Sequence, residues 1–423
     1  MTDYVKDLST WLDGGLSPWH TVQAAADFLA AQGFAALAPD APFTVERGGK
    51  YYVSNDTMLI ALTVGQEAKR FRVAAAHTDW PCMRVKPAPE QVAGGCCKLA
   101  VEPYGGAILR SWMDRPLSLA GAVFLKGDDP LHPQRRLLAW DAPVLTIPEL
   151  AIHMNREVNK GVATLPQTDM LPICRTAQAA WEKDGYLQKK IAERLDVAPE
   201  DILSFELCVY CAEKAQRVGF EGDLLSAPRL DNLTSVHACL HGLTQAQGSQ
   251  INVAVLYDNE EIGSNTRHGA DSATLAVVLE KVALALGMDR AAYLDACTGG
   301  FFLSCDVAHA AHPNHMELAD GVRAPLLGAG VALKLSPRYS TEAQTAAAVR
   351  GLCRENGIAL QTFMNRSDLP GGGTVGSMAS ALFAMPAADI GVPILAMHAA
   401  RELMGAEDQA AVCRLLYAFF SLN

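Results

Sequence analysis

The stretch INVAVLYDNEEIGS, residues 251–264, joins an apolar run to a cluster of acids. Residues 251–256 have the composition of a strand that is buried on both faces. Asp258, Glu260 and Glu261 follow at once. Three carboxylates so close together repel one another, and a strand end that opens into the protein hydrates them poorly. The stretch therefore predicts either a solvated loop or a position where cations gather.

Strand and helix patterns continue on both sides of this stretch. Ser17 and Pro18 begin a predicted helix that closes at Gly33. Two β-rich runs within 50–64 predict a hairpin around Asn55 and Asp56, and residues 70–76 predict a strand. From residue 231 onward helical and strand patterns alternate, which is typical of an α/β domain with a buried sheet.

The middle of the chain has a different character. Residues 87–220 are richer in short strands and turns. Within them, 147–161 predict a helix and 202–212 a strand. We therefore expect an α/β domain built from residues 1–86 plus 221–423, interrupted by a β-rich insertion over 87–220.

Composition limits the classes of function. The chain has 423 residues, of which 50% are apolar and 19% charged, and a formal net charge of −11. This balance argues against nucleic acid or an anionic membrane as a main partner. The N-terminus lacks a secretory pattern, and the eleven scattered cysteines suggest reduced thiols, so we expect a cytoplasmic protein. Cys208 and Cys211, a C-x-x-C without a second pair, are expected to be buried thiols.

Polar residues stand at several predicted strand ends, where α/β sheets bind ligands. These are His77, Asp79, Asp258, Glu260, Glu261, Asp306 and His398, and Asp231 stands at a helix entry. Five of them, His77, Asp231, Glu261, Asp306 and His398, form a set of imidazole and carboxylate groups that suits zinc, with manganese or cobalt as possible substitutes. Five ligands and a spare Glu fit two cations about 3.5–4 Å apart that share a bridging carboxylate, with the Glu taking a proton from the attacking water.

Each residue also has an ordinary explanation. A single H-x-D in a turn and a Glu-Glu pair in a loop are commonly solvated surface groups. Asp231 alone fits a helix N-cap, and His398 fits an interior histidine with satisfied hydrogen bonds. The functional interpretation depends on the coincidence of these groups, because spacing alone does not prove that they converge in space.

The ordered motifs resemble those of the aspartyl aminopeptidases, which are co-catalytic dinuclear zinc exopeptidases. The resemblance runs from about residue 75 to 405 through AAHTDWPCMRVKP, APRLDNL, LYDNEEIGS, SCDVAHAAHPN, VALKLSPRYS and DIGVPILAMHAARELMG. It implies a three-layer, mixed-sheet α/β catalytic domain with an inserted β-rich dimerisation domain.

The resemblance also implies the metal ligands. His77 and Asp306 would bind one zinc, and Glu261 and His398 the other. Asp231 would bridge the two ions.

Further roles follow from the same resemblance. Glu260 would be the general base, and Asp79 would orient His77. His312 would help to stabilise the developing oxyanion. Lys334 is expected near the substrate pocket, and His153 is expected to reach the active site of a neighbouring subunit, although an ordinary surface histidine on a helix is the alternative.

One segment departs from the family pattern. RSDLPGGGTVGS, residues 366–377, keeps Asp368 beside the expected substrate pocket but has a glycine-rich wall. Its glycines lack the ending of a phosphate-binding loop, so we expect a turn that leads into a helix from Thr374. This departure bears on which N-terminal side chain the enzyme prefers to cleave, and not on the metal site.

The sequence therefore predicts a metallo-aminopeptidase that releases one N-terminal residue, Asp or Glu, from peptides. The resemblance implies homo-oligomers, with dimers that assemble to a tetrahedral dodecamer. The alternatives are a dinuclear zinc aminopeptidase that prefers neutral residues, a deacylase of N-acyl amino acids with the same plan, and an assembly scaffold without catalysis.

Overall fold

The computed structural model describes residues 3–177, 185–369 and 371–423. The chain forms two compact units, which are described separately. The first comprises Met1–Asp79, Ala215–Met397 and Glu402–Asn423, and the second comprises Trp80–Lys214 and His398–Arg401. The domain boundaries predicted from the sequence, 86/87 and 220/221, stay a prediction.

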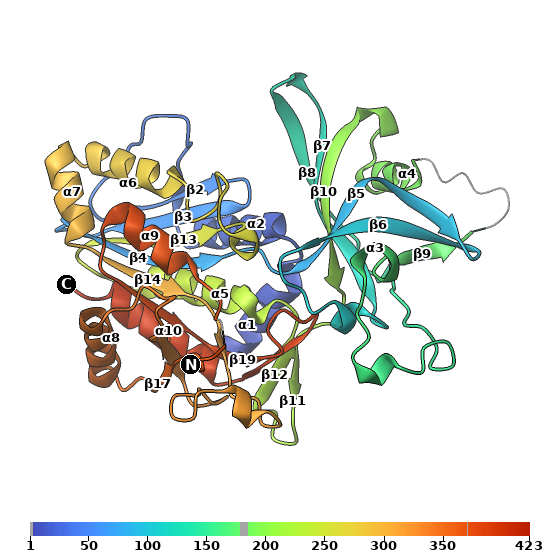
Figure 1. Cartoon of the computed structure of the whole chain (residues 1–423). Coiled ribbons are helices and arrows are strands. Elements are labelled where there is room, and N and C mark those ends of the chain that lie inside the picture. Colours follow the sequence, from blue (N-terminus) through green and yellow to red (C-terminus); the bar gives the residue numbers. More distant parts are fainter. Residues whose placement is uncertain (1–2, 178–184, 370) are drawn as a thin grey trace. The chain divides into compact units, whose positions relative to one another are not determined.

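The first unit is built on a nine-stranded mixed sheet (Figure 1). In spatial order its strands are β1 (Ala35–Ala36), β2 (Lys50–Asn55), β3 (Met58–Val64), β13 (Ile251–Tyr257), β4 (Phe71–His77), β14 (Phe301–Cys305), β18 (Ala387–Gly391), β16 (Val331–Lys334) and β17 (Leu360–Phe363). A five-stranded sheet accompanies it, in the order β11 (Gln216–Val218), β12 (Leu224–Ala227), β20 (Glu402–Gly405), β19 (Pro393–Leu395) and β15 (Ala308–His309).

Helices cover both faces of the large sheet, as Figure 1 shows. On one face lie α1 (Tyr4–Gly14), α2 (Pro18–Ala31), α5 (Leu230–Gln245), α8 (Ala343–Glu355) and α10 (Asp408–Phe420). On the other lie α6 (Thr274–Ala285), α7 (Arg290–Thr298) and α9 (Val375–Phe383). The predicted three-layer α/β architecture is confirmed.

The alternation of strand side chains produces two apolar cores. Along β13, Ala254 and Leu256 pack with the α5 face, whereas Val253 and Val255 pack with the α6 face. All four side chains are fully buried. A strand in this position must be apolar on both faces, which accounts for the run at residues 251–256.

The second unit contains a six-stranded sheet. Its order is β8 (His132–Ala139), β7 (Leu117–Asp129), β10 (Ile202–Cys211), β5 (Cys82–Ala93), β6 (Cys96–Tyr104) and β9 (Ile173–Thr176), and the pairs are antiparallel. The helices α3 (Pro166–Asp169) and α4 (Tyr186–Leu195) belong to this unit. Cys208 and Cys211 on β10 are buried thiols, as predicted.

The helix predicted over 147–161 is wrong. These residues form turns and a short 3-10 helix at Val158–Lys160. Ile147 is buried, but Leu150 and Met154 are 54% and 74% exposed. An amphipathic helix of this length needs a surface on which to pack its apolar face, and these side chains pack on none within the described residues.

The other local predictions hold. Ser17 caps α2, with its Oγ accepting the His20 N–H, and Pro18 occupies the first turn. The predicted hairpin is β2–β3, which pair antiparallel around Asp56. Thr374 is the N-cap residue of α9, as expected for the turn that follows the glycines.

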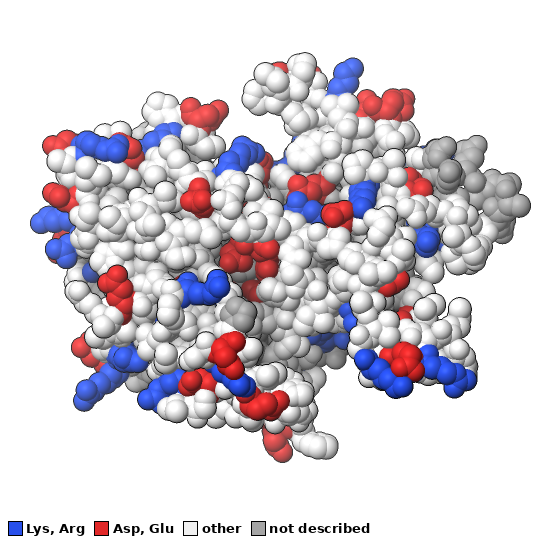
Figure 2. Space-filling view, viewed as in Figure 1, with Lys and Arg blue, Asp and Glu red and all other residues white. Residues whose placement is uncertain are grey.

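Charged side chains contribute little to holding this fold. On the face drawn in Figure 2, acidic and basic side chains are interspersed among uncharged ones. Exposed ion pairs such as Lys160–Glu157, at 3.0 Å, are screened by solvent and stabilise a protein by less than about 1 kcal/mol each. The stability of each unit therefore comes mainly from its apolar core.

A search of the described helices for membrane spans finds none with the length and hydropathy to cross a bilayer.

Candidate metal centre

The acid-rich turn and the first histidine lie at the same edge of the large sheet. Strands β4 and β13 are parallel neighbours, and His77 pairs in register with Tyr257. Because parallel strands end together, the turn that carries Glu260 and Glu261 begins beside His77. The acidic residues that follow β13 therefore lie beside His77, the last residue of β4.

Two further carboxylates contact the same histidine. His77 Nε2 lies 3.3 Å from Asp231 Oδ1 and 3.5 Å from Asp306 Oδ1. Asp306 directly follows β14, which pairs in parallel with β4. Asp231 lies at the start of α5, where it and Asn232 depart from helical geometry and share a cis peptide bond. His77, Asp231 and Asp306 therefore meet at one point, although they belong to three separate segments of the chain.

Asp79 connects His77 to the acidic turn. Its backbone carbonyl lies 3.0 Å and its Oδ1 3.3 Å from His77 Nδ1, and Oδ1 accepts the Glu260 N–H, also at 3.3 Å. Its Oδ2 accepts the Glu261 N–H at 3.2 Å. A carbonyl or carboxylate oxygen that accepts from Nδ1–H leaves the Nε2 lone pair available for a metal, as in many metal sites with a histidine ligand. Asp79 therefore orients the imidazole and holds the turn.

The electrostatics of the cluster favour an added cation. Burial opposes protonation of His77, but Asp231, Asp306 and Asp79 outweigh it and raise the His77 pKa well above its usual range. Burial, reinforced by neighbouring carboxylates, raises the pKa of Glu260 to about 7. Burial and Asp231 raise the pKa of Glu261 well above its usual range. Buried acids without a counter-charge retain protons, and a divalent cation supplies that charge instead.

The geometry of the donor atoms fits a metal. His77, Asp231 and Asp306 each offer a ligand atom, and these atoms lie within 4.8 Å of one another. The same holds for His77, Glu260 and Glu261. Imidazole and carboxylate together are the ligand set of catalytic zinc, with manganese or cobalt also suited.

Two residues that support the cluster escaped the sequence analysis. Glu402, which is 3% exposed, accepts the Asp231 N–H at 3.1 Å. The Asn232 side chain donates to the Cys305 carbonyl at 2.9 Å. The only sequence signal for Glu402 is a charged residue that begins an apolar strand, and its contact with Asp231 spans 171 positions.

Asp258, the remaining acid of the turn, has a different position. It is buried, and its carboxylate accepts hydrogen bonds from the Thr57 hydroxyl and the Asn259 N–H. Asn259 has φ = +62°, a conformation that asparagine adopts more readily than most residues. Asp258 therefore shapes the turn that presents Glu260.

The residues predicted to contact substrate are distributed. Lys334 is buried, with its Nζ 3.4 Å from Asp306 Oδ2. His312 follows β15, and its ring centroid lies 5.1 Å from that of His315. Asp368 is ion-paired with Arg366, with 2.7 Å between Oδ1 and Nε.

The two predicted histidines of the second unit have different surroundings. His153 is exposed within turns, so the helix-surface alternative is wrong about its secondary structure. His398 has φ = +68°, and its Nδ1 lies 3.1 Å from the Gly106 carbonyl oxygen.

A cavity of about 280 Å³ lies within the first unit. Its lining includes His309, His312 and Arg366, together with Phe363. Phe363 pairs in register with Lys334, whose ammonium contacts Asp306. The strand pair β16–β17 therefore connects a residue of the cavity lining to a residue that contacts the cluster.

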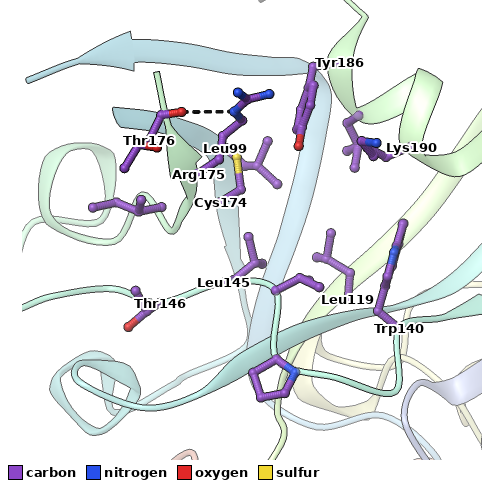
Figure 3. Close-up of a pocket in the computed structure, with 14 residues that line it drawn as sticks. Leu99, Leu119, Trp140, Leu145, Thr146, Cys174, Arg175, Thr176, Tyr186 and Lys190 are labelled. Carbon is purple, nitrogen blue, oxygen red and sulfur yellow. Dashed lines mark hydrogen bonds between the residues drawn. The ribbon is translucent and has the colours of Figure 1, made fainter. Parts of the chain in front are cut away.

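A larger cavity of about 540 Å³ lies in the second unit (Figure 3). Its walls are mostly apolar, including Leu99, Leu119 and Trp140, with Arg175 and Lys190 also in the lining. Tyr186 stands near both cations, 5.4 Å from Arg175 and 5.9 Å from Lys190 by ring centroid. None of the metal-type clusters among the described residues includes a residue of this lining, so its size does not indicate a hydrolytic site.

A mixed sheet with imidazole and carboxylate groups at its strand ends defines a metal-dependent hydrolase, and the comparisons give the family. The family described as Aminopeptidase I zinc metalloprotease (M18) matches residues 11–420. Two proteins named probable M18 family aminopeptidase 2 are similar over 99% of this chain and 99% of their own. The protein of Clostridium novyi (strain NT) is 39% identical, and that of Clostridium acetobutylicum is 40% identical.

Solved structures are also similar to this chain over nearly its whole length. The chain aligns with that of the Ape4 and Nbr1 complex at a TM-score of 0.95 and 29% identity, covering 99% of this chain and 85% of the other. The crystal structure of prApe1 aligns at 0.91 and 25% identity, covering 99% and 93%. The chain belongs to the M18 family of zinc aminopeptidases and is a metallo-aminopeptidase, as the motifs predict.

Proposed function

We propose that this aminopeptidase uses two zinc ions held by the residues that the motifs predict. His77 and Asp306 would hold one ion and Glu261 and His398 the other, with Asp231 shared between them. The observation that carries the proposal is the approach of His77, Asp231 and Asp306 to within 4.8 Å at the edge that also presents Glu260. The contact of His398 Nδ1 with a backbone carbonyl supports its part, because it is the bond by which ligand histidines are commonly oriented.

Bound zinc in such a site lowers the pKa of water and polarises the scissile carbonyl. The chain supplies the movement of protons. Glu260 takes a proton from the attacking water and passes it to the leaving amine. Asp79 keeps the Glu260 backbone in place through its N–H, and His312 stabilises the developing oxyanion.

The substitution Glu260→Gln tests this assignment. It preserves shape and removes the proton acceptor, so turnover should fall by about 10²–10⁴-fold while bound zinc is unchanged. Asp27→Asn, an exposed position on α2, is the control for handling and stability. Full activity of Glu260→Gln with zinc retained would remove Glu260 from the role of base.

Preference for N-terminal Asp or Glu is the second part of the proposal. The cavity of about 280 Å³ is lined by His309, His312, His315 and Arg366, which can accept an acidic side chain, although Asp320 also lines it. A panel of aminoacyl fluorogenic substrates tests the preference. Faster release of Leu or Met than of Asp and Glu would contradict it, and cleavage of N-acetyl amino acids alone would indicate the deacylase.

We also propose a homo-oligomer, with dimers that assemble to a tetrahedral dodecamer. The chain aligns with a solved mApe1 dodecamer at a TM-score of 0.85 and 25% identity, covering 98% of this chain and 96% of the other. Leu150, Ile152 and Met154 beside His153 are at least half exposed, which suits a surface covered by another subunit. In this proposal 87–220 is the dimerisation domain and His153 reaches a neighbouring active site. Native mass spectrometry measures the assembly, and a monomer at micromolar concentration would contradict it.

The proposed compartment is the cytoplasm. All eleven cysteines are reduced thiols in the structure, and nine of them are buried. Reduced thiols in this number suit a reducing environment.

A further inference from the structure

A second group of potential metal ligands lies on helix α5, away from its N-terminal Asp231. His237 and His241 are four residues apart and therefore lie on the same face of the helix. Helix α1 packs there and contributes Asp7. Asp7 Oδ2 is 3.1 Å from His237 Nε2 and 2.7 Å from His241 Nε2. His237 lies six positions after Asp231, with more than one turn of regular helix between Asn232 and His237.

The geometry points to a further divalent metal site formed by Asp7, His237 and His241, of the kind that takes zinc, cobalt or nickel. One ligand atom from each residue lies within 4.8 Å of the other two. Ligands bound to zinc at about 2.0–2.1 Å in a tetrahedron are about 3.3 Å apart, so the observed distances of 2.7 and 3.1 Å need only a small opening. Three protein ligands leave one position for water.

The surroundings are those of a built site. His237 is fully buried and His241 is 8% exposed, whereas the Asp7 side chain is 37% exposed and gives solvent access. Trp11 stands edge-on to His237, with the ring centroids 6.4 Å apart. Phe28 lies 5.3 Å from the ring of His241. These aromatic groups fix both imidazoles and limit the water around them.

A buried polar atom beside the group supports a ligand here. Gln409 Oε1 is buried without a hydrogen-bond partner among the described residues. Gln409 Nε2 lies 2.9 Å from His237 Nδ1, so in the metal-free form it donates to Nδ1 and the proton of His237 resides on Nε2. When a metal takes Nε2, the proton moves to Nδ1, and a half-turn of the Gln409 amide lets Oε1 accept it, in exchange for the hydrogen bond that Gln409 Nε2 donates to the Thr234 carbonyl at 3.0 Å.

The protonation states at neutral pH favour metal binding. Burial lowers the pKa of His241 to about 4 and also lowers that of His237. The hydrogen bond from His237 lowers the pKa of Asp7. A metal therefore meets two neutral imidazoles and an ionised carboxylate.

Metal stoichiometry tests the site in the full chain. Wild type, His241→Gln and the control His20→Gln are dialysed to equilibrium against zinc, and bound zinc per chain is measured by elemental mass spectrometry. His20 is a partly buried histidine on α2 outside the cluster. His241→Gln should bind one equivalent fewer than wild type and His20→Gln, with peptidase turnover within twofold of wild type.

A structural role alone gives a different result. If the group serves only to hold α1 on α5, His241→Gln lowers the thermal midpoint without changing bound zinc, and the proposal fails. Asp7→Asn decides the question if His241→Gln does not fold, because Asp7 is partly exposed and the substitution keeps its shape. Equal zinc in Asp7→Asn and wild type overturns the site. Because turnover and stoichiometry are separate readouts, loss of this site is distinguishable from failure of the catalytic assignment.

Discussion

Replacing Asp79 by Asn tests how the metal centre is held together. The carboxylate contacts His77 Nδ1 and accepts the Glu260 and Glu261 N–H groups, at 3.2–3.3 Å. Asparagine keeps one acceptor oxygen and places an NH₂ group, which cannot accept, where the other oxygen was. At least one of these interactions is therefore lost, and the amide also lacks the charge that favours Nδ1–H.

The magnitude follows from the kind of bond lost. A hydrogen bond to a charged group contributes about 1.5–3 kcal/mol, and loss of a carboxylate behind a ligand histidine lowers activity or metal affinity by about 10–100-fold. We expect kcat/KM of Asp79→Asn to fall by about 10–100-fold, which corresponds to about 1.4–2.7 kcal/mol.

The assay measures hydrolysis of an aminoacyl fluorogenic substrate, with zinc content and thermal midpoint recorded on the same samples. Asp27→Asn, on the exposed side of α2, should match wild type. Wild-type kcat/KM in Asp79→Asn, with zinc retained, would refute the idea that this carboxylate orients the ligand and the base.

Other perturbations have defined outcomes. Phe302→Ala opens a cavity at a fully buried position and should lower the free energy of unfolding by about 3–5 kcal/mol in urea titration; a change below about 1 kcal/mol would contradict the described core. Burial lowers the His20 pKa from 6.5 to about 4, so stability due to neutral His20 is complete above pH 6.5 and lost as pH falls toward 4, by up to about 3 kcal/mol. His20→Gln should flatten this slope, and an unchanged slope would exclude His20 as its source. Treatment with 1,10-phenanthroline should abolish peptidase activity and added zinc should restore it, whereas activity after complete zinc removal would count against a metal-dependent reaction.

Patterns along the chain predict the sheet well because its strands are buried on both faces. The run at 251–256 must be apolar throughout, and the polarity change after Tyr257 marks where the strand ends. The position of His77 at a strand end is predictable in the same way, because it follows the apolar run of β4. Parallel neighbours then bring His77 and the turn at 258–261 to one edge, so strand ends are informative about the site.

Other features depend on contacts that no local pattern encodes. Residues 147–161 have helical periodicity, yet Leu150 and Met154 find no packing surface within the described residues and the helix does not form. The bond from the Asp231 N–H to Glu402 and the approach of Asp7 to His241 join positions 171 and 234 residues apart. Such pairs become visible only when the fold is known.

The most direct measurement is anomalous X-ray scattering at the zinc edge from crystals of the zinc-loaded protein. The account predicts two strong peaks about 3.5–4 Å apart, with Asp231 between them, His77 and Asp306 on one, and Glu261 and His398 on the other. Crystals that hold zinc elsewhere, with no anomalous density within coordination distance of His77 and Asp231, would contradict it.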